Sequence, residues 1–99
     1  MSVEVSAAKH AIYDKLESQI NTAVAKLQTL KARAEAAKAN AEITAVANLV
    51  TKKEELHRNL QELKKSGADR WEHAKADLEA RIAEFEKSVK GIEAKVKAH

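Results

Sequence analysis

The chain has 99 residues, of which 44% are hydrophobic and 33% charged, with no proline, no cysteine, two glycines and one each of Trp, Tyr and Phe. This composition is typical of long helices and excludes the alternating apolar pattern of β-strands. The net charge is only +3, from 18 basic and 15 acidic residues mixed along the chain, so no segment forms the basic arm of a typical nucleic-acid-binding protein.

The first predicted helix covers residues 3–39 and carries one apolar seam, meaning a row of apolar side chains at heptad spacing. Steps of three and four residues alternate along it, as in helices that pack in coiled coils. The members of this first seam are Tyr13, Leu16, Ile20, Ala23, Leu27, Leu30, Ala34 and Ala37.

The second seam does not continue the register of the first. An unbroken heptad would place apolar residues at 41, 44, 48 and 51, whereas the observed members are Val46, Leu49, Lys53, Leu56, Leu60 and Leu63. Two arrangements explain this slip. Asn40 could separate two helices, over 3–39 and 41–66, within an antiparallel three-helix bundle. Alternatively, one long helix could cross a local stammer and form a hairpin with the last helix, and this hairpin would dimerise to cover its exposed half.

Lys53 lies among the leucines of the second seam. Its aliphatic stem can pack against them while its ammonium group reaches solvent. A polar residue at such a position can also fix the register or the oligomeric state of a coiled coil.

The clearest predicted turn is the segment 66–69. Gly67 suits the left-handed conformation just past a helix end. Asp69 is the predicted N-cap of the next helix, with Glu72 completing a capping-box pattern. The third helix is predicted over 69–98, and its seam consists of Trp71, Leu78, Ile82, Phe85, Val89, Ile92 and Val96. Trp71 is expected to cover the end of the bundle, or else to be a binding hot spot.

Four segments carry a resemblance to a known group of proteins. They are Arg33-Ala34-Glu35-Ala36, Ala39-Asn40-Ala41-Glu42-Ile43, Leu56-His57-Arg58-Asn59-Leu60-Gln61-Glu62-Leu63 and Ser66-Gly67-Ala68-Asp69-Arg70-Trp71-Glu72. With these, the chain resembles small bacterial coiled-coil proteins, some of which are described as stress-response proteins. The resemblance implies a helical, non-enzymatic, cytoplasmic protein, and it carries over no functional residue. The first helix is richer in Ala and Thr than is usual in that group.

Two histidine–carboxylate pairs are the weak candidates for a metal site. His10 with Asp14, and His73 with Asp77, are four residues apart and therefore share a helical face. In an up-down-up bundle, both pairs would lie at the same end. Each pair lies beside its seam, however, and no H-E-x-x-H motif or Cys/His cluster accompanies it. We therefore expect solvated histidines and no bound metal.

No motif for catalysis, secretion or membrane insertion is present. The serines have no neighbouring base in a recognisable motif, so we expect no enzyme, no cofactor and no small-molecule substrate. The first eleven residues lack the apolar run of a signal peptide, and no stretch approaches the roughly 20 apolar residues of a membrane span. The expected location is the cytoplasm.

The sequence predicts one helical domain over 1–99 that acts through helix–helix contacts. Because alanine-rich seams bury little area, association with a second copy or with a partner helix would add stability. The residues expected to make these contacts are the large seam members: Leu16, Ile20, Leu27, Leu30, Leu56, Leu60, Leu63, Trp71, Leu78, Phe85 and Ile92.

An alternative function is reversible binding to an acidic surface, either an anionic membrane or a nucleic acid, through Lys-rich amphipathic helices. Nucleic acid is disfavoured, because Glu54, Glu55 and Glu62 alternate with the lysines of residues 52–65 and no aromatic residue lies there for base stacking. A membrane surface is disfavoured because the apolar faces are rich in alanine.

Overall fold

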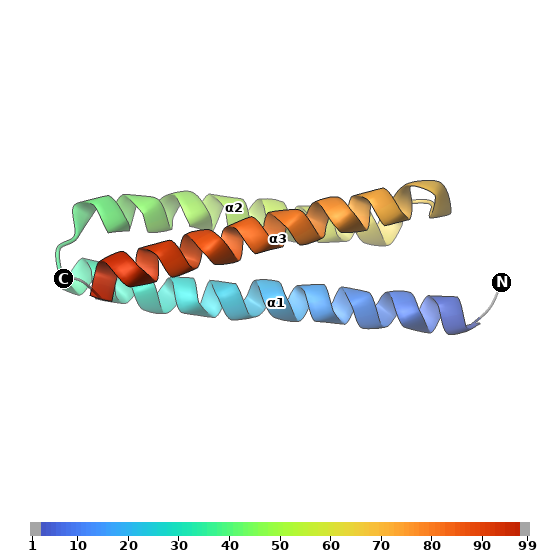
Figure 1. Cartoon of the computed structure of the whole chain (residues 1–99), viewed down its shortest axis with the longest axis horizontal. Helices are drawn as coiled ribbons and strands as arrows, with labels where there is room; N and C mark the ends of the chain where they lie inside the picture. Colours follow the sequence, from blue (N-terminus) through green and yellow to red (C-terminus); the bar gives the residue numbers. More distant parts are fainter. Residues whose placement is uncertain (1–2, 98–99) are drawn as a thin grey trace.

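Three α-helices lie side by side in a rod that measures 55 × 18 × 15 Å along its principal axes (Figure 1). The computed structural model describes the backbone of residues 3–97 and the side chains of residues 8–97. The helices are α1 (Val3–Ala36), α2 (Asn40–Lys65) and α3 (Ala68–Lys97). The predicted all-α, three-helix bundle is confirmed, and the long-helix hairpin is excluded. Residue 98, the predicted end of the third helix, lies outside the described residues.

The three seams close on one another in a single core. Every apolar member of the second and third seams is buried, and no polar or charged side chain within residues 8–97 is buried. Burying one such aliphatic side chain stabilises a fold by roughly 1.5–3 kcal/mol. The most completely buried large side chains are Leu16, Ile20, Leu27, Val46, Leu60, Leu63, Leu78, Ile82 and Val89. Each seam is therefore covered by the other two helices of the same chain.

The first seam differs from its prediction at both ends. Tyr13 is only half-buried, and Ala37 is exposed. Ala37 was wrongly placed in the core because the heptad was extended past Ala36, where α1 ends.

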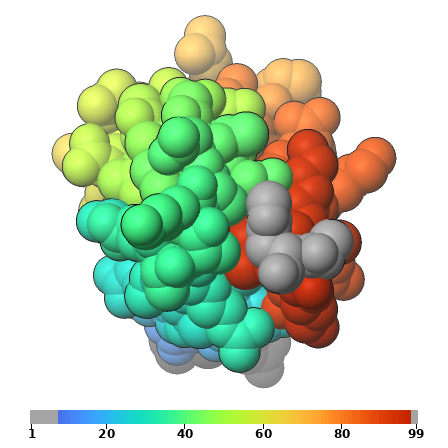
Figure 2. Space-filling model, turned by 90° about the vertical axis from the view of Figure 1, so that its left-hand side faces the viewer, coloured from blue at the N-terminus to red at the C-terminus, as the bar shows by residue number. Residues whose placement is uncertain are grey.

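The register slip is produced by a Schellman motif at the end of α1. The N–H of Ala39 donates to the carbonyl of Ala34 (2.9 Å), and the N–H of Lys38 donates to that of Glu35 (3.1 Å). Lys38 adopts the left-handed conformation that this motif requires, with φ 56°. Ala34 and Ala39 are both buried beneath the turn. At this end of the bundle, the turn lies beside the last turns of α3 (Figure 2).

The second turn is built differently from its prediction, because Gly67 does not have a positive φ. The C-cap residue that follows α2 is Ser66, which has an extended backbone with φ −71° and ψ 147°. The Ser66 N–H and Oγ both donate to the carbonyl of Leu63, at 3.2 and 2.7 Å. The serine hydroxyl therefore caps the helix without a left-handed residue, and the predicted role of Gly67 was wrong.

The start of α3 also differs from its prediction. The carbonyl of Gly67 accepts the N–H groups of Arg70 and Trp71, at 3.1 and 2.9 Å, so Gly67 holds the cap position. Asp69, predicted as the N-cap, lies inside the first turn. There its carboxylate is near the positive end of the helix dipole.

Lys38→Gly should raise the free energy of unfolding by about 1 kcal/mol, because glycine adopts a left-handed φ without the steric cost of a Cβ. Lys38→Ala is the matched control, since it removes the charge and keeps the Cβ. Chemical denaturation monitored by circular dichroism measures both. Equal stability of the two variants would contradict the strain assigned to Lys38.

Lys53→Leu should raise the free energy of unfolding by about 1 kcal/mol, because Lys53 is half-buried on the core side of α2 and leucine would bury more apolar area there. Lys52→Leu, at an exposed position, should have a much smaller effect. If Lys53 also fixes the register, light scattering of Lys53→Leu should show a mixture of masses. A single, unchanged mass would show that Lys53 does not fix the register.

Candidate interaction groove

All eleven residues predicted to contact a partner lie in the core of the bundle itself. Each is at most 6% exposed. While the bundle is closed, these side chains contact the other helices of the same chain and offer very little surface to a second protein. Any contact with a partner must therefore use mainly side chains outside the core, or the bundle must open.

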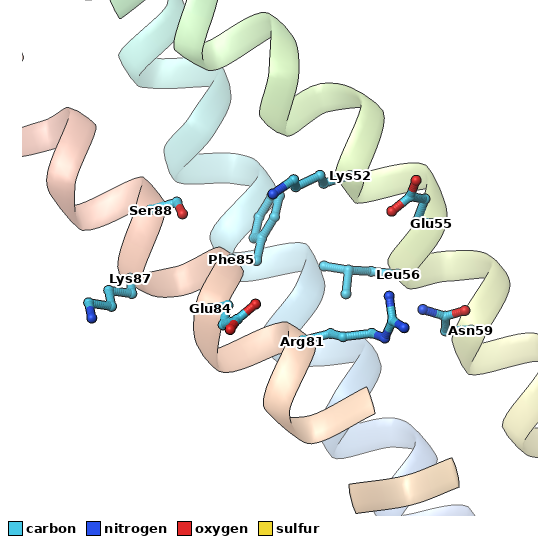
Figure 3. Close-up of a pocket in the computed structure, with 9 residues that line it drawn as sticks. All are labelled: Lys52, Glu55, Leu56, Asn59, Arg81, Glu84, Phe85, Lys87 and Ser88. Carbon is cyan, nitrogen blue, oxygen red and sulfur yellow. The ribbon is translucent and has the colours of Figure 1, made fainter. Parts of the chain in front are cut away.

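A groove lies between α2 and α3 on the outside of the bundle. It encloses about 370 Å³ and is shown in Figure 3. Two predicted contact residues, Leu56 and Phe85, form its floor and are 4% and 3% exposed. The complete lining is Lys52, Glu55, Leu56, Asn59, Arg81, Glu84, Phe85, Lys87 and Ser88.

The groove follows from the heptad pattern of the two helices. Lys52 and Asn59 are seven residues apart on α2, and Arg81 and Ser88 are seven residues apart on α3. These positions flank the apolar seams and therefore border the contact between the two helices. In coiled coils, charged residues at flanking positions determine partner choice and orientation.

Two cations reach across the groove from opposite sides. Lys52 extends from α2 over Phe85, and Arg81 extends from α3 toward Asn59 (Figure 3). Along the groove, the Glu84 carboxylate lies between Lys52 and Arg81, whereas Lys87 points away from the groove. Positive and negative groups therefore alternate along the groove.

Most of these charges have no partner within the described residues. Arg81 is the exception, because its Nε donates to Oδ2 of Asp77 at 2.9 Å. No ion pair within residues 8–97 involves Lys52, Glu55 or Glu84. The groove thus presents charged groups of both signs that are free to pair with another molecule.

A second feature is the aromatic pair at the α2–α3 end of the bundle. Nε1 of Trp71 donates to the hydroxyl of Tyr13 at 2.9 Å, and the two rings meet edge-on with their centroids 6.5 Å apart. Trp71 is 6% exposed. Lys9 lies 4.9 Å from the centre of the Trp71 ring, and Lys64 lies 5.9 Å from that of Tyr13. Trp71 therefore closes this end of the core, with ammonium groups around it.

The histidine–carboxylate pairs lie at the same end but do not converge. His10, Asp14, His73 and Asp77 are all exposed. His10 contacts the Tyr13 ring edge-on, and Asp77 accepts a hydrogen bond from Arg81. Within the described residues, no three His, Cys, Asp or Glu side chains come close enough to hold a metal ion.

The outer face of α1 carries a second heptad row that was not predicted from the sequence. Its members are small, uncharged and exposed: Ser18, Thr22, Ala25, Thr29 and Ala32. The Thr29 hydroxyl donates to the Ala25 carbonyl at 3.3 Å, which satisfies it within the helix. Its alternating steps of four and three residues are visible in the sequence, but three of its five members are Ser or Thr, and a seam is recognised by apolar residues.

No protein-family model matches the chain, and neither the curated proteins nor the solved structures contain a match to it. The resemblance to small bacterial coiled-coil proteins therefore stays a prediction. None of the helices described here is long and apolar enough to cross a membrane.

Tyr13→Phe should lower the free energy of unfolding by about 1 kcal/mol, because it leaves the partly buried indole N–H of Trp71 without its hydrogen-bond partner. In a Trp71→Phe background, the same change should cost much less, since no indole N–H is left unpaired. The difference between the two backgrounds is the coupling energy of the pair. An equal cost in both backgrounds would show that the hydrogen bond contributes nothing.

Proposed function

We propose that the protein is a non-enzymatic structural or interaction protein of the cytoplasm that acts through helix–helix contacts made on the outside of a closed bundle. The main support is that the large apolar residues of all three seams are consumed in one internal core. Only one large apolar side chain within residues 8–97, Val50, is exposed, at 39%. The outside is therefore suited to polar contacts that need no rearrangement of the core.

The α2–α3 groove supports this proposal as the place of contact. It combines an apolar floor with charged walls, in which Lys52, Glu55 and Glu84 have no ion-pair partner within residues 8–97. The partner would be a second copy of the chain or a helix of another protein. A role in stress response is supported only by the resemblance of the sequence segments.

The proposal includes no enzymatic role, and the side chains that line the groove support this. Catalysis needs a nucleophile or an acid–base pair held together in a sheltered site. In the groove, Ser88 is exposed and its neighbours are solvated Lys, Arg and Glu side chains, without a histidine.

Reversible binding to an acidic surface is the second candidate function. The observation that favours it is the group of ammonium ions around the aromatic pair, where Lys9 and Lys75 lie 4.9 and 5.9 Å from the centre of the Trp71 ring. The apolar faces that would insert into a membrane are buried in the core. Such binding would therefore depend on charge alone and would weaken steeply with added salt.

Photo-crosslinking in the native cells should distinguish the two functions. A photoreactive residue at Ser88 in the groove should give a discrete crosslinked polypeptide, whereas one at the exposed Glu54 of α2 should not. Purified protein should also fail to sediment with anionic vesicles at either low or physiological salt. Salt-sensitive sedimentation with vesicles, together with no polypeptide crosslink from any outer position, would contradict the proposal.

A further inference from the structure

The charged side chains of the groove follow a definite order along its length. Lys52 lies at one level, Glu55 and Glu84 lie at the next, and Arg81 lies beside Asn59 at the third (Figure 3). Lys52 and Asn59 are seven residues apart, which is about 10.5 Å along α2. Successive levels are therefore separated by about one helical turn, or 5.4 Å.

This spacing matches one kind of occupant better than an extended peptide. A helix that lies along the groove presents one side chain to it per turn, at positions i, i+3 or i+4, and i+7. In an extended strand, side chains on one face are about 6.6–6.8 Å apart, so they would drift out of step with the three levels.

A second copy placed symmetrically would meet like charges. A two-fold axis through the centre of the groove, at Leu56 and Phe85, would bring the Glu55–Glu84 level against the same carboxylates of the other copy. Such like-charge contacts disfavour association. The chain has a row of alternating charge in Glu55, Arg58 and Glu62. Glu55 is also a wall of the groove, however. In an assembly in which every copy makes the same contacts, the Glu55 of each copy would have to line its own groove and also enter the groove of a neighbour, which one side chain cannot do.

We propose that the groove binds an amphipathic helix of another protein whose contact stripe is acidic at i, basic at i+3 or i+4, and acidic at i+7. The two acidic side chains pair with Lys52 and Arg81, and the central basic side chain pairs with Glu55 and Glu84. The small apolar residues between them cover Leu56 and Phe85. The proposal deepens the proposed function and depends on it.

Two synthetic helical peptides of equal composition provide the test. One carries Glu, Lys and Glu at positions i, i+4 and i+7 of the contact stripe, and the other carries Lys, Glu and Lys there, with the exchanged charges placed on the far face. Fluorescence anisotropy of the labelled peptides at low salt should show at least tenfold tighter binding of the acidic–basic–acidic peptide.

A charge-reversed groove should invert this preference. The variant combines Lys52→Glu, Glu55→Lys, Arg81→Glu and Glu84→Lys, and circular dichroism shows whether it still folds. The matched control reverses four exposed residues elsewhere, Lys15→Glu, Lys26→Glu, Glu35→Lys and Glu54→Lys, and should keep the original preference. Because both variants change two residues of each sign, the net charge of the protein is constant.

Equal affinity for the two peptides, binding of neither peptide, or an unchanged preference in the reversed groove would overturn the proposal. Light scattering gives a further test, the mass of the protein in the absence of any peptide. A doubled mass that the groove variant abolishes would identify a second copy as the occupant and also overturn it. If a second copy occupies the groove, the proposed function stands and the proposal of a partner helix in the groove is wrong. The same holds if polypeptide crosslinks arise only from other faces of the bundle.

Discussion

Burial of three apolar seams against one another is the interaction on which this structure depends. A single helix covers only one side of a seam, so an alanine-rich helix needs two neighbours to remove its leucines from water. The chain supplies both neighbours itself, because α2 returns along α1 and α3 returns along α2. Within residues 8–97, Val50 is the only exposed large apolar side chain, and this is why the proposed contacts with other molecules use charged side chains outside the core.

The positions of the seams could be predicted from the sequence because they depend on the geometry of the helix alone. Heptad spacing placed every apolar member of the second and third seams correctly. The bounds of the helices depend on local turn chemistry, which was less visible. A Schellman turn with lysine in the left-handed position lacks the glycine that usually marks it. Conversely, the visible glycine, Gly67, lies where a serine hydroxyl had already capped the helix end.

The groove could be predicted only in part. Leu56 and Phe85 were identified as contact residues, and they form its floor, but the contact they make is within the chain. The charged walls come from two helices, and the turn at 66–67 sets how far one is shifted along its axis relative to the other. The sequence does not give that shift. Likewise, the hydrogen bond between Tyr13 and Trp71 joins residues 58 positions apart, and heptad spacing alone does not indicate it.

The closure of the three seams within one chain is tested most directly by the distance between residue 10 in α1 and residue 65 at the end of α2. Because the chain has no cysteine, spin labels can be attached at only two introduced sites, at the exposed His10 and Lys65. With labelled protein diluted in unlabelled protein, pulsed electron paramagnetic resonance reports the distance within one chain. The closed bundle predicts a separation comparable with its 18 × 15 Å cross-section. A separation near 80 Å, as expected for 55 residues of continuous helix at about 1.5 Å each, would contradict it.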